Sequence, residues 1–407
     1  MKEGNFRTSS SSSDSSTSQP TRRVLTKSDL IESENLPLQS LFLIGNQKPF
    51  EEEGNFLKSS NSKFLRVLDL ENTKIQSLPD EVGDMIHLRY LGLKHTDLTE
   101  LPAGLGNLID LQTLDIRWCG KIIALPNEVL NLVRLRHLKM FKNEGMDGVN
   151  LQEGIGTLTN LLTLTGINAS GGIAEELGNL TQLRRLGVMR VAEEHIRELF
   201  SSIMNMQNLL SLSLEAIHTF NQGKLVLLDS FSPPPFLRKL RLEGLLEKVP
   251  SWLGSMESLI NIRLGFSHLS QNPTLVLQLL PNLKTLTLWH AYDAKQIGKE
   301  FCEAGGFPKL EVLIIASHVL EEWTDLEEGA LPSLKCLNMH NCLKLRMLPE
   351  GLQFVTALKQ LHLLPLLDDH EERLKPDGGQ ENYKIRHIPH VSYITMSTVR
   401  HHAMGSR

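Results

Sequence analysis

The sequence predicts an α/β solenoid: a curved horseshoe with a parallel β-sheet on its concave face and short helices or irregular turns on its convex side. Three observations predict it. A six-residue pattern, L-x-x-L-x-L, begins fourteen times between Leu38 and Leu358. Successive starts are about 25 residues apart, which is within the period of leucine-rich repeats. Hydrophobic residues make up 41% of the chain but aromatic residues only 5%, so the core has to be aliphatic.

The spacing inside one unit predicts a strand and its return. The last two leucines of the pattern stand two residues apart, so on a strand they share the face that points into the solenoid. Strands from successive units then stack in parallel. Several returns open with Leu-Pro, as at Leu78-Pro79 and Leu101-Pro102, and proline suits the first turn of a short helix.

Composition divides the chain into four parts. Residues 1–20 form a Ser/Thr-rich tail that cannot bury enough apolar surface to fold, so we expect disorder there. Residues 21–64 form an N-terminal initial unit and linker, and residues 65–366 form the repeat array. Residues 367–407 are expected to hold a loop over 368–382, a terminal strand or cap over 385–394, and a tail, because an exposed end unit needs covering.

Charge and cysteine usage exclude several classes of protein. The formal net charge is −5, whereas a general nucleic-acid binder is usually markedly basic. The four cysteines form no C-x-x-C pair, which argues against a zinc knuckle or a redox motif. No signal peptide and no stretch of eighteen apolar residues is visible, so we expect no membrane span and a cytoplasmic location.

No catalytic or cofactor motif stands out, so the chain is expected to be no enzyme and to carry no cofactor or metal. G-x-S-x-G and H-E-x-x-H are both absent. A histidine group near the C-terminus and an acidic run could in principle bind a metal ion. We interpret both as solvated surface, because no complete ligand set accompanies them. The residues concerned are His387, His390, His401 and His402, and Asp368, Asp369, Glu371 and Glu372.

Cysteine and tryptophan are given structural roles. Cys119 and Cys342 fall three residues after the last strand position, where Thr73 and Thr96 stand in other units. We expect buried side chains there that satisfy the backbone where the strand turns away. Asn143 is expected in the same position of its unit, and Trp252 and Trp323 are expected to pack in the return segments.

The outward face of the sheet carries the candidate binding residues. Side chains alternate along a strand, so residues between and beside the buried leucines point away from the core. Concave repeat sheets are the usual contact surface of solenoids, although an ordinary solvated face is the alternative. The candidates are Tyr90, Lys94, Arg117, His137, Lys139, Phe141, Arg185, Lys239, Arg241, Arg263 and Trp289, with Asp115 beside them.

One group of candidates is expected to be a basic cluster. Arg241 and Arg263 occupy the same position of neighbouring strands, and Lys239 lies two residues from Arg241 on the same face. Like charges at adjacent sheet positions are destabilising, with Glu243 as a partial screen. The cluster therefore suggests contact with an acidic surface, and the alternative is that the side chains splay into solvent.

The repeats resemble those of a known family. The segments Phe64-Leu65-Arg66-Val67-Leu68-Asp69-Leu70 and Ile86-His87-Leu88-Arg89-Tyr90-Leu91-Gly92-Leu93 are similar to early repeats of plant nucleotide-binding leucine-rich-repeat immune receptors of the coiled-coil class. Segments 38–43 and 385–391 resemble the two ends of that family's array. The resemblance implies a plant disease resistance module that senses or restrains a protein partner. That partner would be a pathogen effector, a host guardee, or a nucleotide-binding domain in cis or trans.

The chain departs from that family in one respect. No phosphate loop of the form G-x-x-x-x-G-K-[ST] is present, so nucleotide switching is not carried over. We expect the repeat domain alone, as a short product or a truncated gene model. The alternative function is a general intracellular scaffold of the Ras-group leucine-rich-repeat type. The uneven repeat length favours the immune module, because scaffold repeats tend to be regular.

Overall fold

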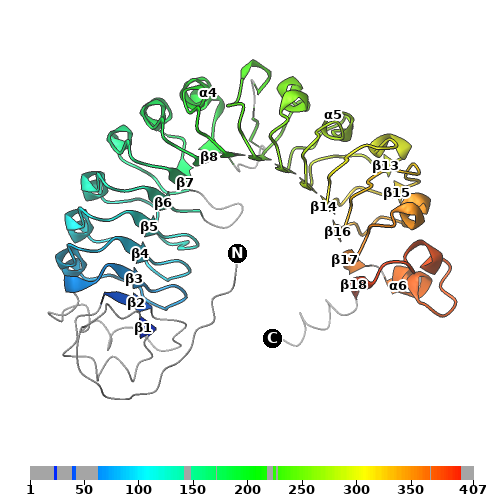
Figure 1. The fold of residues 1–407 in the computed structure, drawn as a ribbon, viewed down its shortest axis with the longest axis horizontal. Coiled ribbons are helices and arrows are strands. Elements are labelled where there is room, and N and C mark those ends of the chain that lie inside the picture. Colours follow the sequence, from blue (N-terminus) through cyan, green and yellow to red (C-terminus); the bar gives the residue numbers. More distant parts are fainter. Residues whose placement is uncertain are drawn as a thin grey trace, which may run out of the picture.

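The computed structural model describes residues 23–24, 39–42, 63–141, 148–170, 172–217, 223–225, 228–366 and 368–395. They form a curved solenoid whose strands line the inner side of an arc and whose helices lie outside it (Figure 1). The predicted leucine-rich-repeat fold is confirmed. The expected tail over residues 1–20, most of the initial unit over 21–64, and Asn143 lie outside the described residues.

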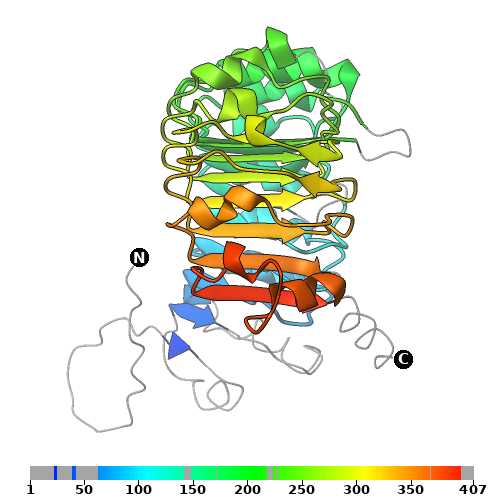
Figure 2. The ribbon, with the colours of Figure 1, turned by 90° about the vertical axis from the view of Figure 1, so that its right-hand side faces the viewer.

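One parallel sheet runs through the whole molecule. Its sixteen strands follow chain order except that β13 and β15 are left out of it, and every pairing is parallel (Figure 2). The strands are β1 (Arg23–Val24), β2 (Ser40–Phe42), β3 (Val67–Asp69), β4 (Tyr90–Gly92), β5 (Thr113–Asp115), β6 (His137–Lys139), β7 (Thr163–Asn168), β8 (Arg185–Val191), β9 (Ser211–Ala216), β10 (Lys239–Glu243), β11 (Asn261–Gly265), β12 (Thr285–Trp289), β14 (Val312–Ala316), β16 (Cys336–His340), β17 (Gln360–Leu366) and β18 (His390–Thr395).

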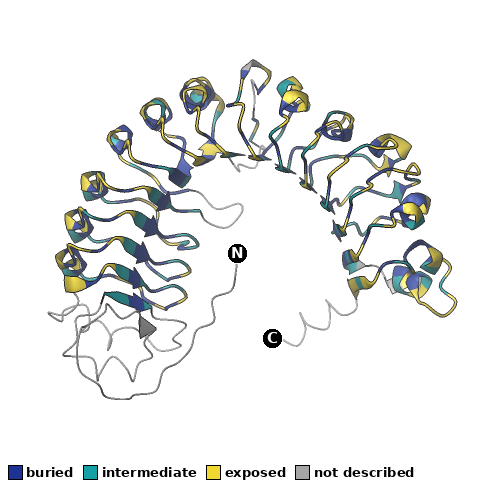
Figure 3. Ribbon diagram, in the orientation of Figure 1, coloured by how far each residue is buried: buried dark blue, intermediate teal, exposed yellow. Residues whose placement is uncertain are grey.

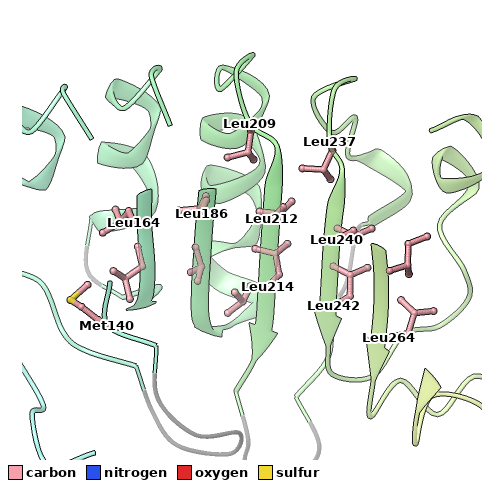
Figure 4. Packing of buried hydrophobic residues seen from close by; sticks show 14 of the residues in the cluster. Met140, Leu164, Leu186, Leu209, Leu212, Leu214, Leu237, Leu240, Leu242 and Leu264 are labelled. Atoms are coloured by element: carbon pink, nitrogen blue, oxygen red, sulfur yellow. The ribbon is translucent and has the colours of Figure 1, made fainter. Parts of the chain in front are cut away.

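The leucines of the repeat form the core, as their spacing predicts. Leu91, Leu114 and Leu138 pair in register across β4, β5 and β6 and are 0% exposed. Burying one such side chain stabilises the fold by about 1.5–3 kcal/mol. Figure 4 shows how the same positions of later strands stack into one continuous aliphatic layer. Each unit therefore completes its core only through its neighbours.

The convex side is built mainly from short 3-10 helices. Proline lies at the N-cap of five of them, at Pro79, Pro102, Pro126, Pro250 and Pro349, with φ between −57° and −73°. The prediction that Leu-Pro marks the start of a short helix is confirmed. The proline is the N-cap residue, one position before the first helical turn in which it was expected. The 3-10 helices are η3 (Asp80–Asp84), η4 (Ala103–Asn107), η5 (Asn127–Asn131), η6 (Ile155–Thr157), η7 (Leu177–Asn179), η8 (Glu193–His195), η9 (Leu228–Ser230), η10 (Ser251–Ser255), η11 (Lys299–Phe301), η12 (Glu350–Phe354) and η13 (Asn382–Lys384).

Longer units place other elements on the convex side. α3 (Ile173–Glu176), α4 (Ile196–Met204) and α5 (Thr274–Leu277) are α-helical, and β13 (Gln296–Ile297) pairs with β15 (Glu322–Trp323) as a separate two-stranded sheet. Both tryptophans pack in these returns, as expected. Trp252 donates from Nε1 to the carbonyl oxygen of Leu228 at 2.7 Å, and Trp323 is buried against Phe301.

The C-terminal region corrects one expectation. The loop expected over 368–382 begins with helix α6 (Asp368–Leu374). Acidic residues favour the N-terminal turn of a helix, and His370 and Leu374 stand one turn apart on a face that is buried. The predicted terminal strand is present as β18, which pairs with β17 and extends the sheet at that end.

A repeated turn follows the strands. The residue two positions beyond the last strand leucine has positive φ at Asn72, His95 and Trp118, among others. The next side chain turns inward and bonds to the backbone: Thr96 Oγ1 donates to the carbonyl oxygen of Leu93 at 2.8 Å, and Cys119 Sγ lies 3.0 Å from the same oxygen. The structural role expected for this position is confirmed.

Candidate functional site

The concave face presents the outward residues of every strand. Register places Lys139, Thr165, Gly187 and Ser213 side by side from β6 to β9, and Arg241 follows on β10. All eleven predicted residues lie on this face or at the strand ends. Most are half-buried by their neighbours, in keeping with the mainly teal and dark blue strands of Figure 3. Arg185 and Lys239 are exposed. The structure gathers Tyr90, Arg117 and Lys139 into one charged patch and Arg241 and Arg263 into another.

The first group, here named the Asp115 patch, comprises Asp115, Arg117, Lys139 and Tyr90. The Asp115 carboxylate is 2% exposed and accepts two hydrogen bonds from Arg117, from Nε at 2.8 Å and from Nη2 at 2.7 Å. Lys139 Nζ lies 3.7 Å from the same carboxylate. A bidentate guanidinium and a second cation thus compensate one buried charge.

Tyr90 completes this patch from the neighbouring strand. Burial is the main cause that raises its pKa to about 12, and the negative charges of Asp69 and Asp115 add to it. Burial likewise raises the pKa of Asp69, which hydrogen-bonds to Tyr90. Lys94, also predicted for this face, bonds to Glu71 at 2.6 Å. The patch therefore presents a neutral phenol beside paired charges.

Aromatic rings border this patch. His95 stacks on Trp118 with ring centres 5.5 Å apart and planes 6° apart, and Trp118 meets Phe141 edge-on at 5.3 Å. His95 and Trp118 both adopt positive φ, which is uncommon for residues other than glycine and is least expected for the bulky Trp118. Sequence reasoning missed both residues, because they follow the strand rather than alternate along it.

The second group, here named the Glu243 patch, comprises Glu215, Arg241, Glu243 and Arg263. Glu243 is 1% exposed, and its Oε1 lies 3.0 Å from Nε of Arg241 and 2.6 Å from Nε of Arg263. Glu215, also buried, lies 3.9 Å from Nη2 of Arg241. The two arginines are Cα partners, as the sequence register predicts.

The prediction of a basic cluster at this place is wrong about the charge. Two buried carboxylates balance the two arginines, so the four residues carry no net charge and the repulsion between the arginines is offset within the fold. Only Lys239 stays exposed, and within the described part of the chain it makes no ion pair. The signal was readable: Glu215 and Glu243 occupy the same position, just after the last leucine of their strands.

Aromatic rings cover both arginines. The guanidinium carbon of Arg263 lies 5.3 Å from the ring centre of Trp289, and that of Arg241 lies 5.3 Å from the ring centre of Phe141. The second contact joins β6 to β10 across three intervening strands. The outward residues at the centres of those strands are short: Thr165, Gly187 and Ser213. The two patches are thus linked above a shallow stretch of the sheet.

Histidines gather at the far end of the concave face. His318 and His290 approach with their Nδ1 atoms 3.1 Å apart, and His268 Nδ1 lies 3.0 Å from the Asp293 carboxylate. Burial lowers the pKa of His290 first, and the neighbouring His318 and His268 lower it further. None of these residues was predicted. His137, which was, hydrogen-bonds to Thr163 at 3.1 Å.

No group of three histidine, cysteine or acidic side chains within the described residues is placed to hold a metal ion. No helix in the described ranges is both long and apolar enough to cross a membrane.

Comparison with known proteins defines the class. A family profile described as "Leucine-rich repeat region" matches residues 48–379, so the chain belongs to the leucine-rich-repeat family. A leucine-rich-repeat protein of Leptospira interrogans has a similar fold, with a TM-score of 0.52 and 22% identity, covering 91% of this chain and 92% of that one.

The particular relatives are plant disease resistance proteins of Arabidopsis thaliana. Disease resistance protein RPP8 is 34% identical over 85% of this chain, and Disease resistance protein RPM1 is 34% identical over 81%. A probable RPP8-like protein 4 is 32% identical over 82%. The chain spans 38%, 36% and 36% of these proteins, respectively. The resemblance seen in the repeats is therefore confirmed.

Proposed function

We propose that this protein is a non-catalytic interaction module of plant immunity, located in the cytoplasm, whose concave face binds a protein partner and senses or restrains it. The observation that carries the proposal is the two patches that surround buried carboxylates, one bordered by aromatic rings and the other covered by them. Aromatic and arginine side chains dominate the binding energy of protein interfaces. The similarity to disease resistance proteins supports the same reading.

The arginine–carboxylate pairs indicate what kind of partner surface the concave face contacts. Because Arg117, Arg241 and Arg263 are held by buried carboxylates, their planar guanidinium groups are fixed before a partner arrives. Fixed side chains lose less entropy on binding than free ones. We infer that the partner is a folded protein surface, which would be a pathogen effector, a guarded host protein, or a nucleotide-binding domain in cis or trans.

The test removes the aromatic anchors from the two ends of the face. Tagged wild-type protein and the double variant Tyr90→Ala with Trp289→Ala are expressed in leaves, with and without infection, and captured proteins are quantified by mass spectrometry. We expect at least one specific partner whose recovery falls about tenfold or more in the variant.

The control variant truncates two large side chains to alanine on the convex side instead. Leu275→Ala with Phe354→Ala alters two exposed side chains, 51% exposed each, on α5 and η12. Recovery of the partner should match the wild type there. If the concave and convex variants capture the same proteins in the same amounts, the concave face is not the binding surface.

A further inference from the structure

A second surface follows the edge of the sheet where the strands begin, at the arrow tails of Figure 2. It consists of the residue directly after the first leucine of each unit, from Arg66 to Lys359, and is named here the flank row. Backbone hydrogen bonds of 2.8 to 2.9 Å join each member to the next without interruption, as from Arg89 N to Arg66 O and from Gln112 N to Arg89 O. The thirteen members are therefore stacked neighbours.

The flank row is strongly basic in a chain whose net charge is −5. Eight of its members are cations, and all eight are exposed. Glu311 is its single acidic member. The cations are Arg66, Arg89, Arg136, Arg184, Arg238, Lys284, Lys335 and Lys359.

Most of these charges have no ion-pair partner among the residues that the structure describes. Lys284 and Lys335 both bond to Glu311 at 2.9 Å, and their hydrogen bonds lower the pKa of Glu311 to about 2. The five arginines and Lys359 form no ion pair with any residue that the structure describes. In this they differ from Arg117, Arg241 and Arg263 on the concave face, which buried carboxylates hold.

The middle of the flank row alternates between two chemistries. Cations stand on every second strand, and an aliphatic side chain stands on each strand between them. Leu210, one of these aliphatic residues, is 36% exposed. Strands are about 4.8 Å apart, so the cations recur about every 10 Å. The order is Arg136, Leu162, Arg184, Leu210, Arg238, Ile260 and Lys284, on or beside β6 to β12.

This spacing selects the shape of a ligand. On an α-helix, positions a and d of a heptad share one face and recur about every 5 Å, and each position repeats about every 10.5 Å. An extended strand matches less well, because residues three apart, about 10 Å, point to opposite faces. Nucleic acid carries a phosphate about every 3.4 Å on each strand and offers nothing apolar for the leucines to contact.

We propose that the flank row binds an amphipathic α-helix of a partner protein, whose exposed stripe alternates acidic and aliphatic residues at heptad spacing. Each carboxylate meets one arginine or lysine, and each aliphatic side chain meets Leu162, Leu210 or Ile260. The surface is separate from the concave face and does not depend on what that face binds.

The probe is a synthetic 28-residue helix with glutamate at every a position and leucine at every d position, labelled for fluorescence anisotropy. It is titrated with the full chain at low salt. A peptide of the same composition in shuffled order, a single-stranded oligonucleotide and phosphatidylserine vesicles are titrated in parallel. We expect the heptad peptide to bind at least about tenfold more tightly than the others and to weaken as salt rises.

Variants locate the binding. Arg184→Glu with Arg238→Glu should weaken the heptad peptide by about tenfold or more, and Leu210→Ser by a smaller factor. Lys74→Glu with Arg197→Glu makes the same change of net charge at exposed positions outside the row and should have no effect. Circular dichroism and thermal melting check that each variant is folded, and Tyr90→Ala with Trp289→Ala should bind the peptide as the wild type does.

Three results overturn the proposal. The first is equal binding of the heptad and shuffled peptides, or no binding of either. The second is an equal loss in the charge-matched control. The third is tighter, row-dependent binding of the oligonucleotide or the vesicles, which would assign the row to a polyanion instead. None of these results bears on the concave face, because its variants are measured separately.

Discussion

The Asp115 patch and the Glu243 patch each pair a buried carboxylate with two cations. The acid and its arginine occupy exchanged positions of the repeat in the two patches. In the first, the buried acid Asp115 stands between Leu114 and Ile116, and Arg117 follows Ile116. In the second, Arg241 lies at the middle and Glu243 follows the last leucine. Both acids are almost fully buried, and both bind a cation from their own repeat unit and one from the next unit.

The difference lies in how far the cations are enclosed. Arg117 is 37% exposed at its side chain, whereas Arg241 and Arg263 are 22% and 20% exposed and lie near aromatic rings. An ion pair strengthens as water is excluded, and so does the penalty for breaking it. The comparison teaches that two patches built around one buried, doubly paired carboxylate can differ in rigidity, with the Glu243 patch the more firmly held.

The largest effect should come from the core beneath the Asp115 patch. Leu138→Asp places an unpaired charge at a position that is 0% exposed, which costs several kcal/mol. Each repeat contacts mainly its neighbours, so hydrogen exchange should rise around β5 to β7 and stay slow around β10 to β12. Loss of protection over both regions at once would show that the two patches fold as one cooperative unit.

The next largest effect is the loss of stability when either buried carboxylate is removed. Glu243→Ala leaves two adjacent arginines without their shared partner and should cost about 3 kcal/mol, while Asp115→Ala should cost about half as much because Arg117 reaches water. Denaturant unfolding of both variants measures the difference. Restoring neutrality with Arg263→Ala in the Glu243→Ala background should recover part of the loss. An equal cost at the two sites would remove the distinction between the patches.

The smallest effect is expected at His290, which follows β12 and makes the stability of the fold depend on pH. The pKa of His290 is lowered in the folded protein, mainly by burial, so the unfolded chain takes up its proton first as pH falls. Stability should therefore decline from about pH 6.5 downward. His290→Asn should reduce that decline, and asparagine also suits the positive φ of 49° at this position. Identical melting curves for both proteins between about pH 7 and pH 5 would refute it.

The sequence predicted the fold well because the leucine spacing determines it. L-x-x-L-x-L assigns every strand its buried face, and the Arg241–Arg263 register followed correctly from it. The first turns of the returns were readable from Leu-Pro, whereas helix α6 was not, because a short charged segment has no long periodic pattern.

The site was predicted only at the level of position. The alternation of side chains along the strands placed Tyr90, Arg117 and Trp289 on the concave face. It could not show that Asp115 and Glu243 would be buried and would pair with the arginines. Those pairs depend on how far each side chain is enclosed by two neighbouring strands. The rings of His95 and Trp118 were missed because a turn with positive φ, rather than strand periodicity, directs them.

The contact between Phe141 and Arg241 has a mechanical consequence. A solenoid behaves as a row of small hinges, because the bend between its two ends is the sum of the angles between successive units. Without cross-links, modest flexing at each hinge would accumulate into a large change of opening. Phe141 and Arg241 lie four strands apart and touch over the hollow side, so they act as a chord across an arc. A chord of this kind opposes opening at four hinges at once, with the strength of about 0.5–2 kcal/mol that one cation–π contact supplies.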